Sequence, residues 1–217
     1  MRESLYSQIV NPFIASHGFD TVLSIDLETI IRNQNDFLTD ERIIAISLTY
    51  FNGDLKTELF IAEDDSIDAE DRILNELDQF ILKFKPSIII GYNQCGYDIP
   101  LLRMKMRKRT YSRQLWNLKY YLSVAYCLDM MPVISDYLAA IDGDYKFRKL
   151  SDVVSHEGFG HLPLDRKKDI VIRNGKNIGE VIEELWRSRS IDFIDYCRGD
   201  TRDVFTIFQD IFRNSKS

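Results

Sequence analysis

The sequence predicts an α/β fold with a central mixed sheet of five to six strands flanked by helices. Strand-like and helix-like segments alternate along the chain, and one strand-like segment is wholly apolar, as in strands buried on both faces. The chain has 217 residues, 45% hydrophobic and 29% charged, which is ordinary for a soluble globular protein. This length allows a sizeable core, so we expect one domain over residues 1–217.

The first three strands are predicted to form an antiparallel meander. Residues 20–29 (DTVLSIDLET), 42–51 (RIIAISLTYF) and 56–63 (KTELFIAE) are rich in β-branched and aromatic residues. The sequence FNGDL between the second and third of them is a turn signal, which favours a tight antiparallel connection.

The middle of the chain predicts a helix, a buried strand and a second helix. Residues 68–84 carry apolar side chains at helical spacing. Residues 85–93 (KPSIIIGYN) hold the short apolar run of a strand buried on both faces. Residues 98–109 then predict a helix with Pro100 near its start, where proline is tolerated.

The remaining segments complete the α/β pattern. We predict a strand over 120–129 (YYLSVAYCLD), a helix over 132–141 and a shorter helix over 149–156. Residues 158–177 are rich in glycine, proline and charge and are interpreted as irregular, with room for a small hairpin. Residues 190–212 predict a long helix that contains one glycine.

Amino-acid composition indicates the cellular compartment of the protein and the kinds of partner that it can bind. The three cysteines are widely spaced and form no CxxC pair, so we interpret them as free thiols in a reducing compartment, the cytoplasm. The N-terminus lacks the apolar core of a signal peptide, and no apolar run reaches the roughly 18–20 residues that span a membrane. The net charge of −6 argues against a protein that simply coats nucleic acid, although acids gathered at a metal site produce the same balance.

Two acids in the first strand raise the question of function. Asp26 and Glu28 are two residues apart, so a strand points them to the same side. Two neighbouring carboxylates repel and are costly to bury, so either a cation lies between them or this end of the strand is wet.

Two further acidic positions have structural and functional interpretations. Asp98 begins the helix after the buried strand, where an N-cap is as plausible as a site role, and Asn93 suits a turn. Tyr196 and Asp200 lie four apart on one helix face, which Asp203 shares; acids on such a face are usually solvated.

Taken together, these positions resemble the DEDD superfamily of 3′–5′ exonucleases. The resemblance is closest to the proofreading exonuclease domain of family B DNA polymerases, whose second motif has the form G-Y-N-x-x-x-x-D-x-P, here GYNQCGYDIP from Gly91 to Pro100. It spans residue 22 to about 212 and implies a ribonuclease H-like fold. Tyr196, four residues before Asp200, matches the tyrosine (DEDDy) branch.

The resemblance implies a two-metal-ion 3′–5′ exonuclease that releases nucleoside 5′-monophosphates from single-stranded nucleic acid, DNA more than RNA. Asp26, Glu28, Asp98 and Asp200 would hold two Mg²⁺ or Mn²⁺ ions, which take oxygen ligands. Tyr196 would orient the attacking water, since a tyrosine with a pKa near 10 is a poor base at neutral pH. A replication or repair protein is a plausible partner.

Other residues near these motifs are candidate substrate contacts or structural groups. A basic stretch without acids runs from Arg103 to Lys119 with aromatic residues interleaved or adjacent, as in phosphate-tracking surfaces, although a solvated helix face explains it nearly as well. The resemblance also suggests a base-separating wedge beside the first motif. The candidate substrate-binding residues are Leu27, Ile30, Asn93, Arg103, Arg107 and Trp116. Asp129 is interpreted as a helix cap and Asp203 as a surface acid or a supporting group.

Two alternatives to the exonuclease remain at this point. A structure-specific nuclease would use the same metal site, and a non-catalytic nucleic-acid-binding module would keep only the fold, although the intact acidic set argues against a pure binder. Glycoside hydrolysis by two carboxylates accounts for Asp26 and Glu28 but not for the other two sites.

Overall fold

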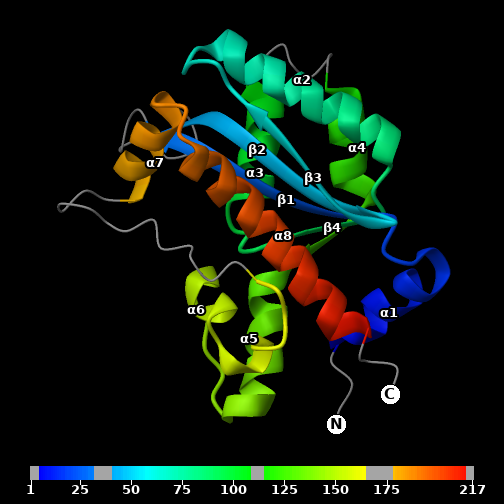
Figure 1. Cartoon of the computed structure of the whole chain (residues 1–217). Coiled ribbons are helices and arrows are strands. Elements are labelled where there is room, and N and C mark those ends of the chain that lie inside the picture. Colours follow the sequence, from blue (N-terminus) through cyan, green and yellow to red (C-terminus); the bar gives the residue numbers. More distant parts are fainter. Residues whose placement is uncertain (1–4, 32–40, 109–114, 165–177, 214–217) are drawn as a thin grey trace.

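A computed structural model describes residues 5–31, 41–108, 115–164 and 178–213 (Figure 1). Its sheet has five strands in the order β3-β2-β1-β4-β5, so the predicted mixed sheet is confirmed. β1 (Val22–Ile31), β2 (Glu41–Asn52) and β3 (Asp54–Ile61) form the predicted antiparallel meander. β4 (Ile88–Gly91) runs parallel to β1, and β5 (Tyr126–Asp129) runs parallel to β4.

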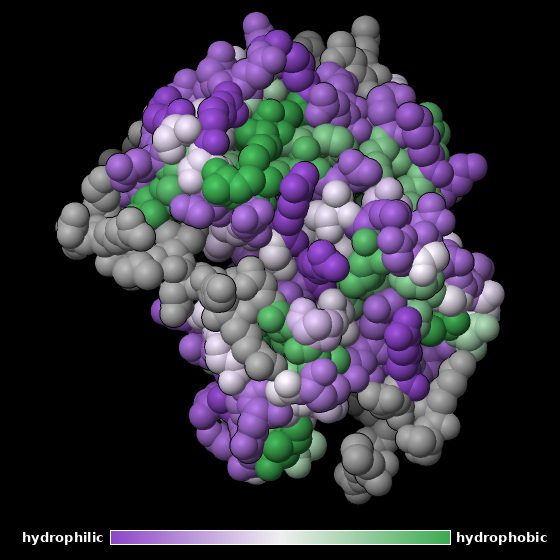
Figure 2. Space-filling model, in the orientation of Figure 1, coloured by the Kyte–Doolittle hydropathy of each residue, from purple (hydrophilic) through white to green (hydrophobic). Residues whose placement is uncertain are grey.

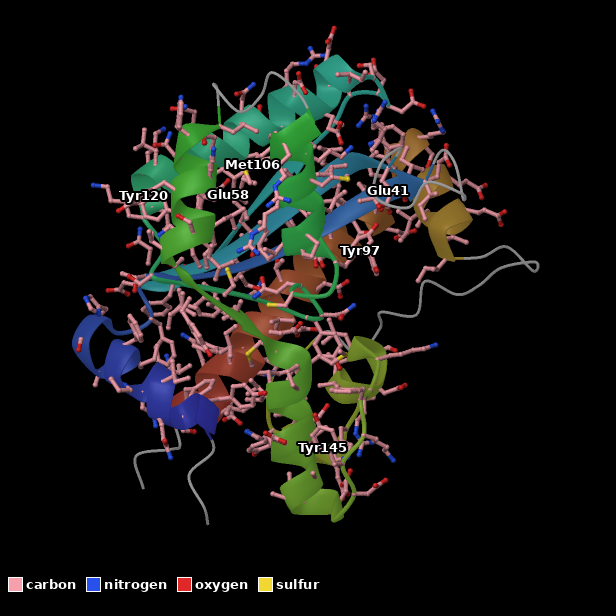
Figure 3. The ribbon with its side chains drawn as sticks, turned by 180° about the vertical axis from the view of Figure 1, so that it is seen from behind. Glu41, Glu58, Tyr97, Met106, Tyr120 and Tyr145 are labelled. Atoms are coloured by element: carbon pink, nitrogen blue, oxygen red, sulfur yellow. The ribbon has the colours of Figure 1, made fainter. Side chains whose placement is uncertain are left out.

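Helices cover both faces of the sheet. α2 (Ile67–Phe84), α3 (Asp98–Lys108) and α4 (Trp116–Val124) lie on one face, and α8 (Ile191–Arg213) crosses the other (Figures 1 and 3). α1 (Leu5–His17), α5 (Met130–Asp142) and α7 (Ile178–Arg187) pack with α8. Short α6 (Leu150–Val154) and the 3-10 turn Glu157–Phe159 follow α5. No helix in the described ranges has the length and apolarity of a membrane span.

The alternation along β1 decides which residues face which helices. Leu23, Ile25 and Leu27 belong to the core cluster that contains the apolar stripe of α2. The even-numbered residues face α8, since Ser47, the cross-strand neighbour of Asp26, hydrogen-bonds Thr201 of α8. Burying one large apolar side chain contributes about 1.5–3 kcal/mol, so these two packed faces hold the strand firmly in register.

Hydrophilic side chains cover most of the α8 side of the molecule, and hydrophobic residues gather mainly in its upper part, below α2 (Figure 2). Because even-numbered residues of β1 face α8, Asp26 and Glu28 point to this side of the sheet. The other face of the sheet is covered by α2, α3 and α4.

The strand predicted over residues 120–129 is partly wrong. Residues up to Val124 belong to α4, and only Tyr126–Asp129 form β5. Buried Asp78 of α2 caps this helix: its carboxylate accepts hydrogen bonds from the Leu118 backbone N–H and the Asn117 side-chain amide, both at 2.7 Å. A cap supplied by another helix leaves no local signal, so the aromatic and β-branched residues suggested a strand instead.

Besides α4, two further helices of the described residues, α1 and α7, were not predicted. α7 has buried apolar residues at helical spacing, Val181, Ile182 and Trp186, so its signal was present. α1 contains Pro12, which weakens a helical pattern. The irregular segment predicted over 158–177 falls largely on residues 165–177, outside the described residues.

Candidate active site

The first two acids lie on β1 where the ladder with β2 is irregular. Asp26 pairs with Ser47 and Glu28 with Ala45, but Thr29 pairs with Ile43, so β2 carries one extra residue at this point. Such bulges bend a strand and re-aim its side chains, and they are common beside active sites. Both carboxylates face α8, as the period of two predicted.

Hydroxyl contacts between α8 and β2 set the position of the third acid. The Thr201 hydroxyl lies 2.9 Å from the hydroxyls of both Ser47 and Thr49. Because Thr201 follows Asp200 and Ser47 neighbours Asp26, this contact brings Asp200 opposite the first motif. Asp26, Glu28 and Asp200 each offer an oxygen, and these oxygens lie within 4.8 Å of one another. In the described part of the chain, no other group of three or more Asp, Glu, His or Cys side chains converges in this way.

The fourth acid, Asp98, lies beside this group at the start of α3. Its Oδ1 accepts a hydrogen bond from the Leu27 backbone N–H at 3.2 Å, and the side chain is buried. Asp98 therefore joins α3 to the β1 segment between Asp26 and Glu28. Gly91, at the end of β4, permits close approach to the same strand, since a Cβ there would lie 2.7 Å from the Ile25 carbonyl oxygen.

The electrostatics of the site favour a bound cation. Burial raises the pKa of Glu28 well above its usual value, and the charges of Asp200 and Asp98 raise it further, while a hydrogen bond with Asp26 lowers it. Burial raises the pKa of Asp98 to about 7, although its backbone hydrogen bonds oppose this. A hard divalent cation would relieve the repulsion, and carboxylate oxygens are among the ligands that suit Mg²⁺ and Mn²⁺.

Tyr196 lies one helical turn before Asp200 on α8. The Glu28 charge raises the pKa of its phenol well above the usual value, and burial and the charges of Asp200 and Asp26 act in the same direction. The hydroxyl therefore keeps its proton at neutral pH and is available as a hydrogen-bond donor.

The loop after β4 is organised by Asp129, whose predicted role as a helix cap is confirmed. Its Oδ1 accepts from the Met131 N–H of α5 at 3.0 Å and from the Asn93 N–H at 2.9 Å. Its Oδ2 accepts from the Cys95 N–H at 3.2 Å. Asn93 is exposed with a φ of 60°, a conformation that asparagine tolerates better than most residues. Its turn interpretation fits, and its exposed side chain leaves a substrate role open.

Two polar residues differ from the sequence interpretation. Gln94, which the sequence did not single out, is buried and donates from Nε2 to the Ile89 and Leu128 carbonyls at 2.9 and 2.7 Å, joining the ends of β4 and β5. Asp203 is buried, so its interpretation as a surface acid is wrong, and its interpretation as a supporting group stays a prediction. The spacing of residues along one helix does not show which other elements cover it.

Leu27 and Ile30, the two residues predicted to separate the terminal base from its neighbour, are not exposed in this conformation. Leu27 is 6% exposed and Ile30 3% exposed, and both belong to the core cluster. Leu27 faces away from Asp26 and Glu28, as strand alternation requires. A role in separating bases would need these side chains at the surface.

The basic stretch is divided by the structure. Arg103 and Arg107 are exposed on α3, and the Arg103 guanidinium donates to the Leu122 carbonyl at 3.1 Å. Trp116 is 62% exposed on α4, across the sheet from the acids. Lys105 is buried and forms an ion pair with Glu70, so it does not belong to an exposed basic surface. Residues 109–114 lie outside the described ranges.

Comparisons with known proteins point to one family. A family model described as "DNA polymerase family B, exonuclease domain" matches residues 6–139, which include Asp26, Glu28 and Asp98. The structure resembles that of the family B DNA polymerase from the hyperthermophilic archaeon Pyrobaculum calidifontis, with a TM-score of 0.58 and 19% identity over 88% of this chain. The chain spans 24% of that polymerase's length. A comparison with curated proteins finds no significant match.

Proposed function

The chain belongs to the family of exonuclease domains of family B DNA polymerases, and from that premise we propose that it is a metal-dependent 3′–5′ exonuclease acting on single-stranded DNA. The observation that carries the proposal is the convergence of Asp26, Glu28 and Asp200 within 4.8 Å, with buried Asp98 beside them. Their order along the chain and their spacing match the DEDDy pattern. The products would be nucleoside 5′-monophosphates.

The carboxylates suit two divalent ions. Asp26, Glu28 and Asp200 would hold one, and Asp98, bonded to the backbone between the first two acids, would help to hold the second. Mg²⁺ or Mn²⁺ would supply the positive charge that stabilises a reacting phosphodiester and acidifies the attacking water. The protein's own contribution is to keep four mutually repelling acids in place until the ions bind.

Tyr196 has the complementary role of a donor. Its protonated hydroxyl, next to Glu28 and Asp200, would hydrogen-bond the attacking water and orient it toward the phosphorus. Asn93 lies in the loop after β4, and Arg103 lies on α3, the helix that begins with Asp98. We therefore favour these two residues as contacts to the bound DNA. Arg107 lies farther along α3 and would contact nucleotides farther from the cleaved bond, whereas Trp116 lies across the sheet from the acids and is not favoured as a contact.

The proposal is tested by digesting single-stranded DNA and RNA of the same sequence with Mg²⁺ or Mn²⁺, labelled in turn at the 5′ and the 3′ end. A 3′–5′ exonuclease yields a descending ladder from the 5′ label and mononucleotides from the 3′ label. An Asp200→Asn preparation controls for contaminating nucleases. Cleavage at internal sites would support the structure-specific nuclease instead, and binding without cleavage would support a non-catalytic module.

Replacing Tyr196 with Phe is expected to leave partial activity. The change removes one hydroxyl and no negative charge, so ions should still bind, and a 10- to 1000-fold slower initial rate is a reasonable order of magnitude for a lost hydrogen bond that orients the attacking water. Initial rates at saturating Mn²⁺ provide the measurement. If Tyr196→Phe is as inactive as Asp200→Asn, then the hydroxyl does more than orient the water.

A further inference from the structure

A polar cluster with a buried ionic part lies on the other face of β1 from Asp26 and Glu28, and the proposed mechanism does not use it. Its members are Thr29, Glu41, Glu70, Tyr97 and Lys105. Glu41 is 0% exposed, Glu70 1% and Lys105 4%. Burying charged groups is costly even when they are paired, and an apolar replacement is often no less stable. Hydrophobic residues could fill this space, so the polar cluster calls for a reason other than stability.

Tyr97 is the centre of the cluster. Its hydroxyl donates to Oε1 of Glu41 and lies 2.9 Å from the Thr29 hydroxyl, whose single proton can go to the Tyr97 oxygen or to the same Glu41 oxygen, 3.2 Å away. Figure 3 shows Tyr97 and Glu41 close together where α3 meets the sheet. The three side chains come from the turn just before α3, from β1 and from the first residue of β2, so they join β1 and the start of α3, which carry Glu28 and Asp98, to β2.

The contacts of Tyr97 and Asp98 hold β1 at two points. Asp98 accepts from the Leu27 N–H, and Tyr97 bonds Thr29, two residues farther along. Glu28 lies between these two points. Two consecutive residues, Tyr97 in the turn before α3 and Asp98 at its start, therefore restrain both sides of Glu28, which limits how far its carboxylate can move relative to that of Asp98.

A buried ion pair between Lys105 and Glu70 adds to these restraints on β1 and β2. Lys105 Nζ lies 2.6 Å from Oε1 of Glu70 and also donates to the Glu41 carbonyl. The same Glu70 oxygen accepts from the Ile43 N–H at 2.9 Å. Ile43 is the β2 residue at which the register shifts opposite Glu28 and Thr29. The pair thus fixes the irregular part of β2 to α2 and α3.

We infer that Tyr97 and Thr29 are positioning residues that set the placement of Glu28 and Asp98 and thereby the affinity of the site for divalent ions. The inference rests on the proposed function, since it assumes that the four acids bind ions. Groups that orient metal ligands through hydrogen bonds typically change metal affinity about 10- to 100-fold when they are removed.

Calorimetric titration of Mn²⁺ into the protein, without nucleic acid, tests this inference. Tyr97→Phe keeps the ring and removes the hydroxyl, and Mn²⁺ binding is expected to weaken about tenfold or more. Thr29→Val should weaken it similarly, whereas Thr29→Ser, which keeps a hydroxyl, should bind nearly as the wild type does. Tyr50→Phe is the matched control: it removes an exposed Tyr–Glu hydrogen bond, to Glu58, at the other end of β2 and should leave affinity unchanged.

The outcomes separate the inference from the proposed function. Wild-type affinity in Tyr97→Phe, or a lower melting temperature with unchanged affinity, would overturn the inference and reduce the cluster to a structural role. Should Tyr97→Phe fail to fold, the Thr29→Val and Thr29→Ser pair decides, and equal affinity in both overturns the inference. If the wild type binds no Mn²⁺, the proposed function fails and the inference with it.

Discussion

Asp98→Asn is expected to lose hydrolysis by about 1,000-fold or more, because the ions stabilise the developing charge by several kcal/mol and each 1.4 kcal/mol is a factor of ten in rate. The asparagine keeps an oxygen at Oδ1 for the Leu27 N–H and nearly the same volume, so the contact between α3 and β1 survives. Only the negative charge is lost. Initial rates of mononucleotide release at saturating Mn²⁺ measure the effect.

Two companion variants make the result specific. Asp195→Asn removes an acid from the exposed face of α8, one residue before Tyr196, and should leave the rate unchanged. Asp98→Ala should be as inactive as Asp98→Asn, but it also leaves the buried Leu27 N–H without its acceptor, which costs about 1–3 kcal/mol. Near-normal hydrolysis by Asp98→Asn would show that the site assignment is wrong.

Asp26→Asn is expected to stabilise the metal-free protein at neutral pH. In the absence of ions, burial and the charges of Asp200 and Asp98 disfavour the ionised form of Glu28 and raise its pKa. An asparagine at position 26 removes one charge from this group and supplies an amide that can donate to Glu28. Thermal unfolding in EDTA should therefore show a higher melting temperature for Asp26→Asn than for the wild type.

The pH dependence of the metal-free protein follows from the same groups. The pKa of Glu28 is raised and that of Asp98 is about 7, whereas unfolded carboxylates titrate near 4. Between about pH 4 and 7 the folded state therefore binds more protons than the unfolded state, so the free energy of unfolding falls as pH rises. The decline should be shallower in Asp26→Asn.

Divalent ions should reverse the order of the two proteins. Ions that bind only the folded state stabilise it by mass action, about 2.7 kcal/mol at one hundred times the dissociation constant. The wild-type melting temperature should rise with Mn²⁺ concentration, and this gain should largely vanish in Asp26→Asn. Equal melting temperatures in EDTA together with equal Mn²⁺ shifts would show that these acids share no ion site.

The sequence predicted the features that depend on local spacing. Asp26 and Glu28 share a face because strands alternate, and Tyr196 and Asp200 share one because helices repeat every 3.6 residues. The same alternation places Leu27 on the opposite face, so its burial could have been foreseen.

The features that the sequence did not predict depend on distant partners. α4 begins where Asp78 of α2 supplies its cap, and Lys105 is buried because Glu70 lies beside it. Both contacts join residues far apart in sequence. The hydroxyl contact from Thr201 to β2, which brings Asp200 to Asp26, likewise becomes visible only when the helix is placed on the sheet.

Binding of divalent ions by the carboxylates is the central claim, and calorimetric titration of Mn²⁺ tests it most directly. Three proteins should be compared: the wild type, Asp200→Asn, and Asp195→Asn as the exposed acid on the same helix. We predict that the wild type and Asp195→Asn bind Mn²⁺ alike and that Asp200→Asn loses most of this binding. Equal binding by all three proteins, or none by the wild type, would contradict the account.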